Sequence, residues 1–175
     1  MKNVRPLVFA GVCLALCLLL PFLTGQIPSI GSSLLPMHLP VLLCGFVCGP
    51  FYGLIVGFIS PLLRFVLFGM PPLMPTGLAM AFELAAYGLF AGLLIKAFPR
   101  KNIHLYSSLL SAMLLGRIVW GIAAYIINHA IGNPFTWQLF FAGAFVNAVP
   151  GIIFQLLVIP PLLYALQKAR VVEFD

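Results

Sequence analysis

Apolar residues follow one another along this chain in long runs that are broken by short segments of proline, glycine or charge. A helix that crosses a bilayer uses about 20 mostly apolar residues, which is close to the length of most of these runs. The pattern therefore predicts an all-α membrane protein, a bundle of six transmembrane helices in one domain spanning 1–175. The predicted spans are 6–24, 38–49, 51–68, 77–98, 105–128 and 138–167.

The second run is too short to cross a bilayer without help. Its length corresponds to a helix of only about 18 Å, at about 1.5 Å per residue. It must therefore tilt, be shielded by neighbouring helices, or continue into the next span through Gly49 and Pro50.

Composition excludes an ordinary soluble domain. The 175 residues are 63% apolar and 7% charged, and the mean hydropathy is +1.16, whereas soluble domains carry charge at about a quarter of their positions. The chain has no GxxxxGK[ST], HExxH or GxSxG motif, so the residues for ATP hydrolysis and for common membrane-protease chemistry are missing. We expect a protein that is not an enzyme and that needs neither cofactor nor metal.

The basic residues predict the orientation of the bundle. With six spans, all the Lys and Arg residues of the connections and ends fall on one side, and the connections on the other side have none. The positive-inside rule places that side, with both termini, in the cytoplasm. The formal charge of +6 is then explained by cytoplasmic loops rather than by binding to nucleic acid. The basic residues assigned to the cytoplasmic side are Lys2, Arg5, Lys96, Arg100, Lys101, Lys168 and Arg170.

Two of the outer connections are unusual for loops that face water. Residues 25–37 and 69–76 are uncharged, rich in proline and partly apolar. They are typical of a lid over the outer face, although connectors that lie at the lipid headgroups would have the same composition.

Three charged side chains lie within the predicted spans and away from their cytoplasmic ends: Arg64, Glu83 and Arg117. A charge at the bilayer centre costs at least about 2.5 kcal/mol, so each should face the interior of the bundle and have a partner. One interpretation is an internal salt bridge of Glu83 with Arg64 or Arg117. Two cations and one anion leave a positive charge over, however, and arginine holds carboxylates through paired hydrogen bonds. We therefore predict a site for a carboxylate ligand in the outer half.

Other side chains at this depth extend the predicted site. Aromatic and apolar groups would form its walls and amides would direct binding, although an Asn in a membrane helix often joins helices instead. His38 opens the second span below the first lid, where a capping role is the alternative, and Gln155 lies deeper as a candidate link between helices. The predicted wall and binding residues are Met80, Tyr87, Trp120, Asn128 and Asn147.

Small residues and cysteines suggest close helix packing. Gly11 and Ala15 form one small-residue face, and Gly53 and Gly57 form another. Packing within the bundle explains such faces, but one on a terminal span is also a plausible dock for another membrane protein.

The cysteines form two pairs one turn apart, Cys13 with Cys17 and Cys44 with Cys48. No His or carboxylate lies near either pair in sequence, which favours small apolar fillers over a zinc site.

Two adjoining sequences resemble a known family. They are LPMHLPVLLCGFVCGPFYGLIVGFISPLL, from Leu35 to Leu63, and GMPPLMPTGLAMAFELAAYGLFAGLL, from Gly69 to Leu94. Both resemble the substrate-specific S component of energy-coupling factor (ECF) vitamin transporters, in the group that includes pantothenate transporters. Length, span count and basic ends agree with this resemblance along the whole chain.

The resemblance implies a subunit of a prokaryotic plasma membrane that captures a vitamin at its outer face. It also implies partners, a transmembrane T component and two ATPase subunits, and docking through small residues of the first span. That face would comprise Ala10, Gly11, Leu14 and Ala15, although the family's pattern has two alanines where this chain has Gly11 and Ala15.

Pantothenate is the first substrate predicted, because its carboxylate suits an unpaired arginine. Nicotinate and biotin are also carboxylates, and riboflavin and pyridoxine remain alternatives. A standalone carrier that uses Glu83 as a proton site is a second function class, and a structural or assembly protein is a third.

Overall fold

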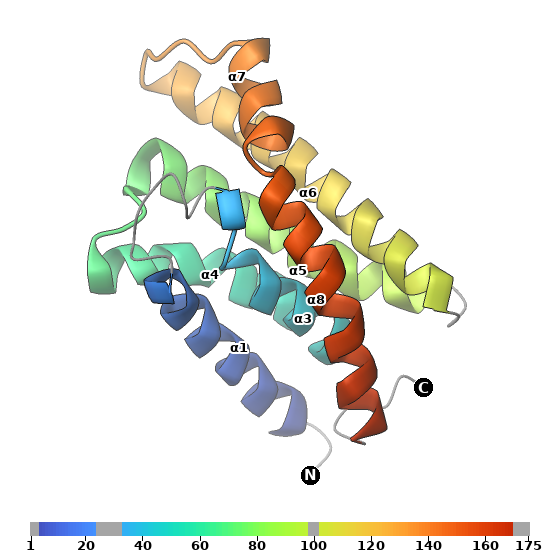
Figure 1. Ribbon diagram of the computed structural model, residues 1–175. Coiled ribbons are helices and arrows are strands. Elements are labelled where there is room, and N and C mark those ends of the chain that lie inside the picture. Colours follow the sequence, from blue (N-terminus) through green and yellow to red (C-terminus); the bar gives the residue numbers. More distant parts are fainter. Residues whose placement is uncertain (1–3, 24–32, 98–101, 170–175) are drawn as a thin grey trace.

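The computed structural model describes residues 4–23, 33–97 and 102–169, and within these ranges the chain consists of helices joined by turns and short connections, without a strand (Figure 1). The N-terminal half contains α1 (Val4–Leu23), α3 (His38–Cys48), α4 (Pro50–Phe68), the π-helical turn η1 (Leu73–Gly77) and α5 (Leu78–Ala97). The C-terminal half contains α6 (Asn102–Ala130), the short α7 (Trp137–Phe141), a second π-helical turn η2 (Ala142–Val146) and α8 (Val149–Lys168).

The predicted six-helix membrane bundle is confirmed. Five helical segments are long and apolar enough to cross a bilayer, and α3 is the shorter sixth. The start of α1 and the end of α8 lie at the same end of the bundle in Figure 1, the lower one. The five long segments are Val4–Leu23, Pro50–Phe68, Leu73–Ala97, His104–Ala130 and Trp137–Lys168.

Neighbouring helices shield α3, which is short for a helix inside a membrane. Every residue from His38 to Phe46 is buried, and α3 packs against α1, α4 and α5. The helix does not continue into α4. Gly49 takes a left-handed φ of 94° between the two, and the chain folds back so that a Cβ on Gly53 would lie 2.8 Å from the Cα of Gly45. Of the three sequence-based alternatives, the structure selects shielding by neighbours.

Helices α4 and α5 approach each other closely through glycines. A Cβ on Gly53 would lie 2.5 Å from the carbonyl oxygen of Gly88, and a Cβ on Gly57 would overlap the carbonyl group of Leu84. The small-residue face of Gly53 and Gly57 therefore serves packing inside this bundle. This contact fixes the height of α5 relative to α4.

The last predicted span, 138–167, is not one continuous helix. Helix α7 ends at Phe141, η2 follows, and α8 begins at Val149 with Pro150 in its first turn. Proline suits the first turn of a helix, where its missing N–H needs no partner. The apolar run concealed this break because hydropathy does not report backbone direction.

Candidate functional site

Three polar side chains from three helices meet inside the bundle. Nη1 of Arg117 on α6 lies 2.7 Å from Oε1 of Glu83 on α5, and Nε2 of His38 on α3 lies 3.3 Å from the same oxygen. Glu83 is 3% exposed and Arg117 is 4% exposed. Of the two predicted pairs for Glu83, the structure forms the one with Arg117.

Tyr87 completes this group, which we call the polar cluster (His38, Glu83, Tyr87 and Arg117). It follows Glu83 by one turn of α5, and its ring meets the His38 ring edge to face at 5.0 Å between centroids. Gly116 lets α6 come close, because a Cβ there would lie 2.6 Å from Cε2 of Tyr87. The glycine thereby places Arg117 beside Glu83. Gly116 was not among the predicted residues, although its position next to an intramembrane arginine could have revealed it.

The polar cluster keeps unused hydrogen-bonding capacity. Nε and Nη2 of Arg117, the hydroxyl of Tyr87 and Nδ1 of His38 are buried and have no hydrogen-bond partner among the described residues. Nε and Nη2 form the side-on fork of a guanidinium group, the edge that grips a carboxylate through two parallel hydrogen bonds. Because Glu83 approaches Nη1, the fork itself is left to another acceptor.

Arg64 does not join the polar cluster. Its Nη1 donates a hydrogen bond to the carbonyl oxygen of Leu18, 2.5 Å away, and its Cζ lies 5.0 Å and 5.4 Å from the ring centroids of Phe22 and Phe68. The side chain is 3% exposed. The expectation that Arg64 supplies spare charge beside Glu83 is therefore corrected, because packing of α1 on α4 directs its guanidinium to the end of α1.

The predicted amides also lie apart from the polar cluster. Nδ2 of Asn128 donates to the carbonyl oxygen of Ala124 in its own helix, at 2.7 Å. Asn147 lies just after η2 with its side chain exposed. The predicted convergence of these amides on Arg117 is thus corrected, because one is used locally and the break before α8 turns the other outward.

The two remaining predicted wall residues are half-buried. Trp120 stacks on Phe140, with ring centroids 6.2 Å apart and an interplanar angle of 24°, and meets Phe135 edge to face. Met80 packs on the main apolar core. Trp120 therefore joins the outer part of α6 to α7 rather than facing Glu83 by any contact that the structure shows.

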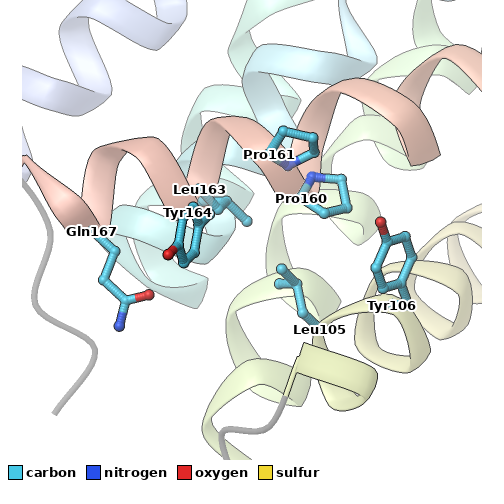
Figure 2. Close-up of a pocket in the computed structure, with 7 residues that line it drawn as sticks. All are labelled: Leu105, Tyr106, Pro160, Pro161, Leu163, Tyr164 and Gln167. Carbon is cyan, nitrogen blue, oxygen red and sulfur yellow. The ribbon is translucent and has the colours of Figure 1, made fainter.

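A hollow of about 270 Å³ lies between the start of α6 and the end of α8 (Figure 2). In Figure 2 the side chain of Tyr106 points toward Pro160 across this space. Tyr106 precedes Arg117 by eleven residues, about 17 Å along a helix, and no charged side chain lines the hollow. It is therefore separate from the polar cluster. Its lining residues are Leu105, Tyr106, Pro160, Pro161, Leu163, Tyr164 and Gln167.

The lid segments are partly described. Residues 25–32 of the first segment lie outside the described ranges. Next to them Leu35 and Met37 are buried, and the backbone N–H of His38 donates to the carbonyl oxygen of Leu35 at 3.0 Å. In the second segment, Leu73 and Met74 are exposed. The role of either segment as a lid stays a prediction.

A second predicted surface, on α1, is only partly available. Gly11 and Ala15 are exposed and Leu14 is half-buried, and a Cβ on Gly11 would meet no atom within 4 Å. Ala10 is 5% exposed and belongs to the main core. The predicted docking face is therefore corrected to exclude Ala10, which lies on the inward side of α1 with Cys13 and Cys17.

All four cysteines are free thiols. Cys13, Cys17 and Cys44 belong to the main apolar core, and Sγ of Cys17 lies 3.6 Å from the carbonyl oxygen of Met37. Within the described ranges, no three His, Cys, Asp or Glu side chains are grouped so that they could hold a metal ion.

Comparison with known proteins assigns the family. The sequence profile described as ECF transporter, substrate-specific component, matches residues 5–163. No curated protein and no solved structure matches the chain at a significant level. The profile covers nearly the whole chain, including every residue of the polar cluster. Members of this family are transport subunits rather than enzymes, and the chain belongs to the family of substrate-specific components of ECF transporters.

Proposed function

We propose that this subunit captures a small carboxylate vitamin at the polar cluster, in the outer half of the bundle, with pantothenate as the first candidate. The observation that carries the proposal is that the side-on fork of Arg117 has no hydrogen-bond partner in the described ranges. A buried donor without a partner costs about 1–3 kcal/mol. A ligand carboxylate that accepts from Nε and Nη2 would remove this cost for two donors at once.

Glu83 has a supporting role in this proposal. Its carboxylate lies 2.7 Å from Nη1 of Arg117 and so compensates the arginine's charge while no ligand is bound. A charge at lipid depth needs an opposite charge or hydrogen-bond acceptors beside it, and Glu83 supplies the opposite charge here. The ion pair also holds the guanidinium in one orientation, and less side-chain freedom is then lost when a ligand binds.

The remaining unpartnered groups favour a ligand with further polar atoms. Nδ1 of His38 and the hydroxyl of Tyr87 are buried without hydrogen-bond partners inside the described part of the chain. Pantothenate carries hydroxyl groups and an amide beside its carboxylate, so it offers both donors and acceptors. His38 and Tyr87 replace Asn147 in this role, since Asn147 is exposed.

The chain must take its energy from partners, because its sequence has no GxxxxGK[ST] motif. We propose docking on a transmembrane T component, which carries two ATPase subunits, through the face of Gly11, Leu14 and Ala15. Gly11 and Ala15 are exposed on α1, and small residues let two helices approach closely in a membrane. The cytoplasmic placement of both termini is part of this proposal.

Substitution of Arg117 by Met tests the binding site. Arg117→Met removes the fork and should weaken pantothenate binding by about a hundredfold, which is about 2.7 kcal/mol. The measurement is isothermal titration of the purified chain in detergent, and Arg64→Met is the matched control that should keep wild-type affinity. Wild-type affinity in Arg117→Met would reject this site.

A further inference from the structure

Gln155 on α8 is a buried amide that nothing in the described structure satisfies. It lies in a stripe of buried residues at four-residue spacing with Gly151, Ile159 and Leu163. Its side chain is 0% exposed, yet neither Nε2 nor Oε1 has a hydrogen-bond partner among the described residues. Buried polar groups in proteins nearly always have partners, so an amide in this state that borders the proposed site can take its partner from a ligand.

Packing brings α8 next to the segment that leads into α3. A Cβ on Gly151 would lie 2.6 Å from the carbonyl oxygen of Ser33 and 3.0 Å from the carbonyl carbon of Leu34. Beyond this point of contact, α8 and α3 both run toward the lower end of the bundle in Figure 1. The two helices pack together. Gln155 lies four residues beyond Gly151, and His38 lies four residues beyond Leu34. Gln155 is thus about one helical turn, roughly 6 Å, along α8 from this contact, and His38 begins α3 within four residues of it.

We propose that Gln155 is a further ligand-binding residue, through which α8 completes the site built by α3, α5 and α6. This inference rests on the proposed function and deepens it. Helix α8 packs against both α3 and α6, the helices that carry His38 and Arg117, so its buried face borders the same interior. A ligand held by its carboxylate at Arg117 would present its other polar groups to Gln155.

The chemistry of an amide narrows the class of ligand. A glutamine side chain both donates and accepts hydrogen bonds. Its partner must therefore also do both, as a hydroxyl, a secondary amide or a ureido group does. The site then suits a small acid that carries such a group, and it disfavours an acid whose remaining polar atom only accepts. Pantothenate and biotin belong to the first class, and nicotinate belongs to the second.

Replacing Gln155 by Leu separates ligand binding from packing. Gln155→Leu keeps a similar volume and removes two unsatisfied polar atoms, so the ligand-free chain should unfold at the same temperature or a higher one. Affinity for pantothenate or biotin should fall about tenfold, which is about 1.4 kcal/mol. Gain of stability with loss of binding is the behaviour expected of a functional residue rather than a structural one.

Ser108 offers a matched control. Its hydroxyl is likewise fully buried without a hydrogen-bond partner in the described part of the chain. It precedes Arg117 by nine residues, about 13 Å along α6. Ser108→Ala should therefore leave the affinity for every probe unchanged.

The experiment titrates pantothenate, biotin and nicotinate into the wild type and both variants, with thermal unfolding of each ligand-free protein. If the wild type binds pantothenate or biotin and Gln155→Leu binds it equally well, the inference is wrong and the proposed function stands. If the wild type binds nicotinate alone, the inference is likewise wrong and the proposed function stands. If the wild type binds none of the three acids, both the proposed function and the inference fail. Should Gln155→Leu not fold, Gln155→Asn, which shortens the side chain by one methylene, is measured in its place with the same expected loss.

Discussion

Two buried arginines of this protein occupy similar helices but different surroundings. Arg117 lies within the bundle against Glu83, with Nε and Nη2 unpartnered among the described residues. Arg64 lies where α1 and α4 meet, bonded to the carbonyl oxygen of Leu18 and close to the rings of Phe22 and Phe68. Both side chains are less than 5% exposed, at 4% and 3%. Burial alone therefore does not distinguish an arginine proposed to bind a ligand from an arginine that joins two helices.

The difference lies in what surrounds each guanidinium group. Near Arg64, a backbone carbonyl and two aromatic faces satisfy a cation without a carboxylate, through a hydrogen bond and cation–π attraction. Near Arg117, Glu83 compensates one edge, and the edge best suited to a carboxylate has no hydrogen-bond partner among the described residues. The first arrangement joins two helices, and the second is the one that we propose binds a ligand.

The largest effect should follow from removing the partner of Arg117. Glu83→Leu leaves a buried guanidinium without a compensating charge, and loss of one member of a buried ion pair costs about 3–5 kcal/mol. We expect a decrease of this size in the free energy of unfolding, measured by chemical denaturation in detergent.

The double variant Glu83→Leu with Arg117→Met is the control for this prediction. It removes both charges, so most of the lost stability should return. A single Glu83→Leu variant as stable as the wild type would show that the ion pair does not hold the two helices.

A smaller effect is expected at the other arginine. Arg64→Met removes one hydrogen bond and two cation–π contacts but leaves no charge behind, so it should lower the free energy of unfolding by about 2 kcal/mol. Ligand affinity should stay at the wild-type value when titrated as for Arg117→Met. A loss of affinity with stability retained would move Arg64 into the binding site.

The smallest effect should come from a ring that contacts Arg64. Phe22 is 40% exposed and also meets Phe68 edge to face at 5.0 Å between centroids. Phe22→Leu keeps an apolar side chain and removes the aromatic contacts, which should cost about 1 kcal/mol. In the background of Arg64→Met the same substitution should cost less, and equal costs in both backgrounds would exclude a cation–π contribution.

The predicted spans agree closely with the helices where the chain forms a single uninterrupted helix. The run 51–68 corresponds to Pro50–Phe68, and the run 77–98 corresponds to Leu78–Ala97. The agreement has a simple cause, since a bilayer requires each spanning segment to satisfy its own backbone. Agreement is lost within the last run, where a break before α8 leaves the hydropathy unchanged.

The candidate site was predictable in its charges but not in their pairing. Glu83 and Arg117 were recognisable because ionisable groups are rare at lipid depth. Which arginine meets Glu83 depends on Gly116, which lets the ring of Tyr87 pack against α6. Asn147 shared the expected depth with Arg117, but depth does not report on which side of a helix a side chain lies.

The sequence by itself determined that the chain forms membrane helices and that a few of its charges need partners, because the solvent inside a bilayer imposes both conditions on each segment separately. Only the tertiary structure decided that Arg117 has two donor atoms without a partner among the described residues, whereas Arg64 joins two helices. That distinction depends on contacts between residues far apart in the chain, which glycines at Gly53, Gly88 and Gly116 allow by bringing backbones and rings together.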